Sequence, residues 1–205
     1  MAKKANTTEL EQPTADLLQQ YAKRFDEDMR YGIADQAIAK LFKQLPYNQE
    51  LKDVLLKVSV INQLYNTNIY ATVAMAKHVH ELKIDSDLES HSLEVVNRIA
   101  EVAISGKKYQ FFSFATKYCS WHDQGNYPIF DSFVEKLIVG YRDQYKFEKF
   151  KTSDLRKYSR FKEVIESFQR HFGLLDFGFK KIDKFLFMYG RKRFGSEQRI
   201  VPSDF

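Results

Sequence analysis

The 205-residue sequence lacks several features that mark secreted and membrane proteins. It contains a single cysteine, Cys119, so no disulfide can form within the chain. No apolar run approaches the roughly 20 residues that span a bilayer, and the first residues have no apolar segment typical of a secretory signal. These absences predict a cytoplasmic protein without a membrane partner. Because Cys119 lies among aromatic residues on one helical face, we expect its thiol to be buried rather than nucleophilic.

The motifs of several common enzyme classes are also missing. There is no His-Glu-x-x-His, no cysteine pair, no glycine-rich phosphate loop and no Gly-x-Ser-x-Gly. His78 and His80 are two residues apart, which places them about 200° apart around a helix, so they cannot share a metal ion. The sequence therefore predicts no metal site and no cofactor.

Glycine and proline are scarce, with eight and four residues, whereas 44% of the chain is apolar. Apolar residues recur at helical spacing over long segments, and alternation typical of strands is almost absent, which predicts an all-α fold. We expect a flexible N-terminal tail over 1–13, a single domain over 14–190 and a basic C-terminal tail over 191–205. Helices are predicted at 14–25, 29–45, from 51 after a cap at Asn48, 69–82, 88–104, 108–121, from 131, and 179–189.

The positive charge is concentrated near the C-terminus. The formal net charge is +5, and residues 141–205 contain 16 Lys and Arg against 9 Asp and Glu. Such an excess favours a polyanionic partner such as DNA, because basic side chains release counterions from phosphates. Helices with a solvated basic face give the same pattern, so both interpretations stay open.

The most informative stretch is residues 127–138. Pro128 prevents a helix from continuing through it, and Asp131 stands directly before an amphipathic run. This pattern predicts that Asp131 is the N-cap of a helix. The same position would hold a carboxylate ionised and fixed in direction, so Asp131 is either a cap alone or also a catalytic group.

Two polar corners accompany this stretch. Residues 59–68 carry Gln63 and Asn66 where one helix is expected to turn into the next, which indicates either a capped corner or a polar tip that contacts a ligand. Gly106 is followed by Lys107 and Lys108 at a second expected turn between helices. This corner could hold a phosphate, or its lysines could be ordinary surface residues.

Three stretches together resemble the helix-hairpin-helix DNA glycosylases of the endonuclease III type. They are residues 54–66 with the alanine-rich segment 71–76, the Ser-Gly-Lys-Lys turn at 105–108, and the Pro-Ile-Phe-Asp-Ser-Phe-Val segment at 128–134. The resemblance implies a two-lobed helical bundle of about 8–10 helices with the active-site cleft between the lobes. It also implies double-stranded DNA as the partner and hydrolysis of the N-glycosidic bond of a flipped base, with or without a subsequent AP-lyase step.

Site residues follow from the same resemblance. Asp131 would be the catalytic carboxylate, and Lys108, with Lys107 as competitor, would be an amine nucleophile that forms a Schiff base. The residues implied to contact DNA or the flipped base are Gln63, Asn66, Gly106, Lys107, Trp121, Tyr127 and Phe130. Asp131 should then open into a cleft flanked by Gln63 and the Gly106 turn. The alternatives are a DNA-binding relative without chemistry and a helical module that binds other proteins.

Overall fold

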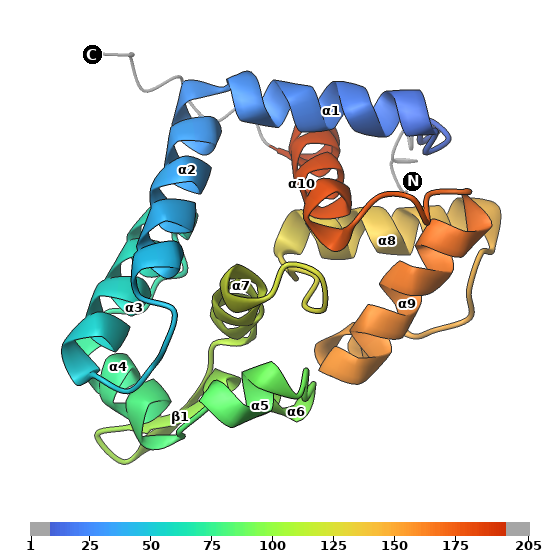
Figure 1. Cartoon of the computed structure of the whole chain (residues 1–205). Coiled ribbons are helices and arrows are strands. Elements are labelled where there is room, and N and C mark those ends of the chain that lie inside the picture. The colour runs from blue at the N-terminus through green and yellow to red at the C-terminus, as the bar shows by residue number, and fades with distance from the viewer. Residues whose placement is uncertain (1–8, 196–205) are drawn as a thin grey trace, which may run out of the picture.

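The computed structural model describes residues 9–195, which form a predominantly helical fold (Figure 1). The elements are α1 Ala15–Glu27, α2 Met29–Gln44, α3 Leu51–Tyr65, α4 Thr72–Glu81, α5 Asp85–Glu89, α6 Glu94–Ala100, β1 Glu101–Ile104, β2 Lys107–Gln110, α7 Phe112–His122, α8 Ser132–Tyr145, η1 Thr152–Arg156, α9 Tyr158–His171 and α10 Phe179–Phe194. The predicted helical class is confirmed, with one short β-hairpin added. No helix among the described residues combines the length and the apolar character needed to cross a membrane.

Helix α7 lies in the middle of the molecule (Figure 1). Helices α2, α3 and α4 lie on one side of it and α9 lies on the other, while α10 packs between α1 and α8. Nine of the eleven residues of α7 are buried. Polar side chains on this helix must therefore find hydrogen-bond partners inside the protein, because a buried polar group without one is strongly unfavourable.

Helices α8 and α10 approach each other closely at Gly190. A Cβ atom at this position would lie 2.9 Å from Cβ of Phe133 and 3.1 Å from its carbonyl oxygen. The glycine thus lets the two backbones pack against each other, and α10 is fixed relative to the segment that begins α8.

The predictions for 88–104 and 108–121 as continuous helices are wrong. This region forms α5, α6 and an antiparallel hairpin in which Ile104 pairs with Lys107 across the two-residue turn Ser105-Gly106. Both turn residues have positive φ angles, 51° and 77°, as hairpins with a right-handed twist require. Helix α7 consequently begins at Phe112 rather than Lys108.

Two expectations at the N-terminal side also need correction. Asn48 does not cap α3, whose N-cap is Glu50, and its side chain is buried instead. Residues 9–13 are not a free tail, because Leu10 is buried and its backbone N–H and carbonyl both bond to the Gln144 side chain at 2.8 Å. The remainder of the predicted tail, 1–8, lies outside the described residues. At the other end α10 extends to Phe194, and the tail predicted beyond 195 is likewise outside them.

Candidate active site

A polar cluster lies inside the protein where α3, α7, α10 and the segment 127–131 meet. Its centre is Lys117, whose side chain is 3% exposed. The Nζ atom donates to Oγ of Ser113, one helical turn earlier, at 2.6 Å and lies 3.5 Å from the carbonyl oxygen of Phe130. Burial lowers the pKa of Lys117, and the nearby carboxyl groups of Asp131 and Asp183 oppose that shift. The neutral form of this amine is therefore more favoured in the site than it would be in water.

A second buried lysine, Lys57, shows how the protein treats a structural ammonium group. Its Nζ donates to the carbonyl oxygens of Leu45 and Tyr47 at 3.2 and 2.7 Å and to Oδ1 of Asn48 at 2.7 Å. All three N–H groups are therefore used, and they satisfy carbonyls at the end of α2. Lys117 has one short hydrogen bond, to the Ser113 hydroxyl, and its ammonium group also lies 5.4 Å from the centre of the Tyr65 ring. The contrast separates a lysine that holds the fold together from one whose amine stays available.

Asp131 is the N-cap of α8, as the sequence predicts. Its Oδ1 accepts hydrogen bonds from the N–H groups of Phe133 and Val134 at 2.8 and 2.9 Å. The residue is half-buried, and Oδ2 forms no hydrogen bond with any residue of 9–195. One carboxylate oxygen is therefore fixed by the helix while the other is free to interact with a ligand.

The backbone before Asp131 is held from three helices. The Ile129 N–H donates to the Asp183 carboxyl of α10, with both oxygens 3.2 Å away, and the Phe130 N–H donates to Oγ1 of Thr116 on α7 at 3.1 Å. The hydroxyl group of Tyr158 on α9 donates to the Pro128 carbonyl at 3.0 Å. These bonds fix the position of Asp131 relative to the Lys117 amine.

A pocket of about 450 Å³ opens beside this cluster. Its lining combines aromatic rings, amide and hydroxyl groups and a guanidinium group, from Thr67, Gln110, Phe111, Phe112, Ser113, Phe114 and Arg156. Ser113 belongs both to the pocket wall and to the hydrogen bond with Lys117. Ser113 is thus shared by the pocket lining and the cluster, whereas Lys117 itself does not line the pocket.

The expected cleft, into which Asp131 should open between Gln63 and Gly106, is wrong in position, because none of these three residues lines the pocket. Gly106, Lys107 and Lys108 are exposed on the β-hairpin, and none of them lines the pocket. Gln63 and Asn66 are exposed at the end of α3, where Asn66 is the C-cap with φ 50°. The pocket instead touches the neighbouring Thr67 and the residues that follow β2.

The corner between α3 and α4 is rigid because Asn62 organises it. Its Nδ2 donates to the carbonyl oxygen of Ile69 at 2.9 Å, and its Oδ1 accepts from the Thr67 hydroxyl at 2.8 Å and the Ile69 N–H at 2.9 Å. These bonds hold the turn between α3 and α4 in place. Asn62 therefore holds this corner, whereas Asn66 is the C-cap residue of α3 and α4 begins after Ala71 without a side-chain cap.

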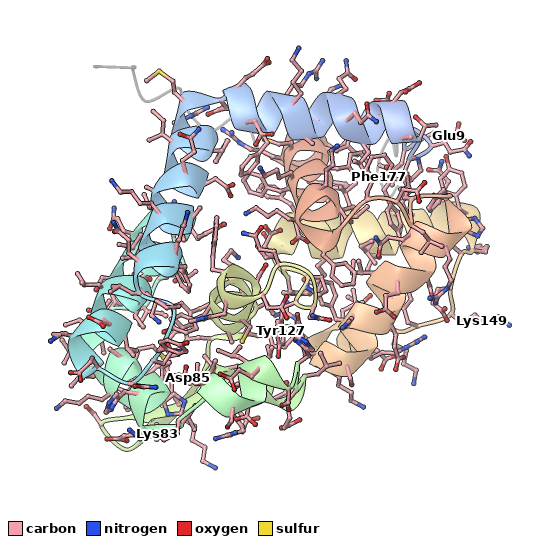
Figure 2. The ribbon with its side chains drawn as sticks, viewed as in Figure 1. Glu9, Lys83, Asp85, Tyr127, Lys149 and Phe177 are labelled. Carbon is pink, nitrogen blue, oxygen red and sulfur yellow. The ribbon has the colours of Figure 1, made fainter. Side chains whose placement is uncertain are left out.

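The three aromatic residues expected to form a base pocket belong to the core. Trp121, Tyr127 and Phe130 are 6%, 0% and 2% exposed, and none lines the pocket. Tyr127 lies at the centre of the molecule (Figure 2). The Trp121 N–H donates to the Tyr65 hydroxyl at 3.1 Å, so this ring supports the floor of the cluster. The prediction is corrected accordingly: residues from Phe111 to Phe114 supply the aromatic walls.

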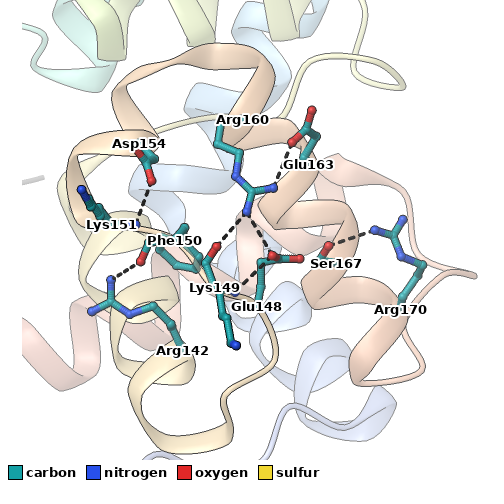
Figure 3. A network of polar contacts seen from close by, with 10 residues as sticks. All are labelled: Arg142, Glu148, Lys149, Phe150, Lys151, Asp154, Arg160, Glu163, Ser167 and Arg170. Carbon is teal, nitrogen blue, oxygen red and sulfur yellow. Dashed lines mark hydrogen bonds and ion pairs between the residues drawn. The ribbon is translucent and has the colours of Figure 1, made fainter.

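Part of the positive charge near the C-terminus is paired with carboxylates at the surface (Figure 3). Arg160 pairs with Glu148 at 3.0 Å and Glu163 at 2.9 Å, while Arg142 bonds to Asp143 and to the carbonyl oxygen of Phe150. These contacts fasten the linker between α8 and α9. The arginines of this network act mainly in structure, so any attraction for a polyanion depends on the lysines.

Sequence reasoning missed Lys117, Ser113 and Asp183. A usable signal exists for Lys117, because it interrupts an apolar stripe formed at helical spacing by Phe114, Tyr118 and Trp121. A charged residue within such a stripe must be buried or must terminate the stripe. Asp183 gives the same signal next to Ile182, but its partner on the 127–131 segment is a backbone group that no sequence pattern identifies.

The fold and the cluster together define a mostly helical protein with an internal lysine beside a helix-capping aspartate. The family model described as HI_0787_N, N-terminal domain, matches residues 17–126. The chain is also 40% identical over 145 residues to an uncharacterized protein of Haemophilus influenzae, which covers 70% of this chain and 69% of that protein. The chain therefore belongs to the HI_0787_N family. No solved structure matches it. The matched range contains Lys117 and ends before Asp131.

Proposed function

We propose that this protein is a DNA glycosylase that excises a flipped base by using the amine of Lys117 and the carboxylate of Asp131. One observation carries the proposal: a buried lysine with a single short hydrogen bond lies within the electrostatic influence of the helix-capping Asp131, and the serine that accepts this bond also lines an aromatic pocket. A lysine with a lowered pKa is what nucleophilic catalysis by an amine requires near neutral pH. In this assignment Lys117 takes the role that the sequence resemblance gave to Lys108.

The proposed chemistry proceeds at C1′ of the sugar. The lone pair of Nζ forms a bond to C1′ while the bond from C1′ to the base nitrogen breaks, and the base leaves with the bonding electrons and takes up a proton. The attached nitrogen then loses a proton and the sugar ring opens with a proton on O4′, which leaves a Schiff base between Lys117 and C1′. Positive charge develops on the sugar during this step, and the free oxygen of Asp131 is placed to stabilise it.

The pocket supplies the groups that a flipped base needs. Phe111 and Phe112 present aromatic surface for stacking, and the amide of Gln110 and the guanidinium of Arg156 offer hydrogen-bonding groups. Its volume of about 450 Å³ is in the range of small-molecule sites. We propose that this fold has the two-lobed arrangement of glycosylases and that the pocket is the cleft between the lobes. The exposed Lys107 and the corner at Gln63 and Asn66 would then contact the DNA around it.

The test is base release from duplex oligonucleotides that each contain one altered base, followed by borohydride trapping of the Schiff base. Wild-type protein should release at least one base and give a trapped adduct. Lys117→Ala should lose the adduct, and Asp131→Asn should slow release by 100-fold or more, in line with the loss of one electrostatic catalytic group. Lys108→Ala, which changes an exposed lysine, is the matched control and should retain both activities.

Two results would overturn the proposal. Duplex binding that weakens with salt but is accompanied by no base release from any substrate would identify a DNA-binding protein without this chemistry. Base release that persists unchanged in Lys117→Ala and Asp131→Asn would place the catalytic groups elsewhere.

A further inference from the structure

Asp183 is a buried carboxyl group for which the proposed chemistry has no direct use. It lies on α10 and is 5% exposed. Burial, the first cause, raises its pKa well above the ordinary carboxyl range, while the hydrogen bond from the Ile129 N–H and the charge of Lys180 act in the opposite direction. A neutral carboxyl group still offers an acceptor oxygen. Asp183 can therefore accept the hydrogen bond from the backbone whether its carboxyl group is charged or neutral.

The bonded N–H occupies a sensitive place in the chain. Pro128 has no N–H group, so the Ile129 N–H is the first donor available on the segment that leads to Asp131. The next residue, Phe130, provides the carbonyl oxygen that lies 3.5 Å from Nζ of Lys117. A shift of this peptide would therefore move both the partner of the amine and the aspartate that follows.

The other attachments of the segment come from different directions. Thr116 on α7 holds the Phe130 N–H, and Tyr158 on α9 holds the Pro128 carbonyl. Asp183 is the contact from α10, which is itself packed tightly on α8 at Gly190. Without it, the peptide between Pro128 and Phe130 has no side-chain anchor on the α10 side among the described residues.

We propose that Asp183 is a positioning residue: by accepting the Ile129 N–H it fixes the backbone that carries Asp131 and the Phe130 carbonyl, and so sets the distance between the carboxylate and the Lys117 amine. This inference rests on the proposed glycosylase function. Misplacement of a catalytic group by about 1 Å can reduce a rate by about 100-fold. The effect of losing Asp183 should therefore appear in the chemical step rather than in DNA binding.

The experiment compares two near-isosteric variants in single-turnover base excision. Asp183→Asn keeps an acceptor for the Ile129 N–H, whereas Asp183→Leu removes it, and far-UV circular dichroism of both variants checks that the fold is maintained. We expect Asp183→Leu to lower the excision rate by about 10- to 100-fold with substrate affinity within about 3-fold of wild type, and Asp183→Asn to stay within about 3-fold in both. Gln169→Leu is the matched control, because Gln169 is equally buried and bonds to a backbone carbonyl, that of Phe177, on another side of the protein.

Amide hydrogen exchange gives a readout that does not depend on DNA. Protection of the Ile129 amide should fall in Asp183→Leu and be retained in Asp183→Asn and Gln169→Leu. Equal rates for Asp183→Leu and wild type, or equal losses in Asp183→Leu and Asp183→Asn, would overturn the positioning role. A wild-type protein without excision activity would instead refute the proposed function itself, so the two failures are distinguishable.

Discussion

The two buried lysines lead to opposite predictions for the same substitution, because the free energy of unfolding should fall at Lys57 and should not fall at Lys117. Substituting methionine, which has a similar length but no charge, removes the ammonium group at either position. For Lys57 the change leaves the carbonyl oxygens of Leu45 and Tyr47 without their Lys57 donor, while the side-chain oxygen of Asn48 keeps its bond from the Tyr118 hydroxyl. Each buried acceptor that loses its partner costs about 1–3 kcal/mol, and relief from burying a charge recovers part of this. We expect Lys57→Met to lower the free energy of unfolding by about 2–4 kcal/mol.

At Lys117 the balance is different. The lost bonds are one to the Ser113 hydroxyl at 2.6 Å and one long contact to the Phe130 carbonyl, which also lies 3.4 Å from the Thr116 hydroxyl. The hydroxyl groups can find other partners, and the unfavourable burial of the ammonium group disappears. Burying an ammonium group is unfavourable unless it is fully paired and hydrogen-bonded, so its replacement by an apolar residue relieves that cost. We therefore expect Lys117→Met to raise the free energy of unfolding by about 0–2 kcal/mol while it abolishes Schiff-base trapping.

The pH dependence sharpens this prediction. The pKa of Lys117 is lowered in the folded protein, so the unfolded chain keeps its proton to higher pH. Wild-type stability should therefore rise as the pH increases from the folded pKa toward the ordinary lysine value of about 10.4, and Lys117→Met should show a smaller rise, because Lys57, whose pKa burial lowers to about 8, still contributes. Any stabilisation by Lys117→Met is then greatest at neutral pH and shrinks in alkaline solution.

The assay is equilibrium urea unfolding followed by far-UV circular dichroism, with both variants and wild type measured across this pH range. A destabilisation of Lys117→Met equal to that of Lys57→Met would refute the reasoning, because it would show that both lysines serve the fold. Loss of stability together with retained trapping would refute the catalytic assignment as well.

Three further outcomes follow from contacts elsewhere in the structure. Burial, assisted by the charge of Lys57, lowers the pKa of His122 to about 3, so the contribution of His122 to stability is complete above about pH 6.5 and falls as the pH decreases toward 3. The free energy of unfolding of wild type should therefore decrease by about 1–3 kcal/mol between pH 6.5 and 4.5. In urea titrations His122→Gln should show a smaller decrease over the same interval. Leu10→Ala should destabilise by about 2–4 kcal/mol in the same assay, because Leu10 is buried against α8; no effect would mean that residues 9–13 do not pack as described. Gly190→Ala should lower the melting temperature by several degrees, because its Cβ would lie 2.9 Å from Phe133, and an unchanged value would contradict the close approach of α8 and α10.

The helical class could be predicted because apolar residues recur at helical spacing over most of the chain. The cap at Asp131 was also predictable, because Pro128 and an acid before an apolar run restrict the local backbone strongly. The hairpin at β1 and β2 was not. Its strands are four residues long, and such short segments give too little periodicity to distinguish a strand from the end of a helix.

The position of the candidate site depends on contacts that local sequence does not specify. Gly106, Lys107 and Lys108 were predicted at an inter-helix turn, but the hairpin moves the start of α7 four residues along the chain, and Ser113 of α7 then lines the pocket. Asp183 reaches the same cluster from 54 residues beyond Ile129. Long-range packing of α10 therefore completes a site that the sequence reveals only at Asp131.

The central claim is that the amine of Lys117 reacts with the sugar, and mapping of the borohydride-trapped adduct tests it most directly. Wild-type protein would be trapped on a duplex that it processes, digested with a protease, and analysed by tandem mass spectrometry to locate the modified lysine. We predict that the sugar remnant lies on Lys117 and that Asp131→Asn lowers its yield without changing its position. A remnant on Lys107 or Lys108 would contradict the account.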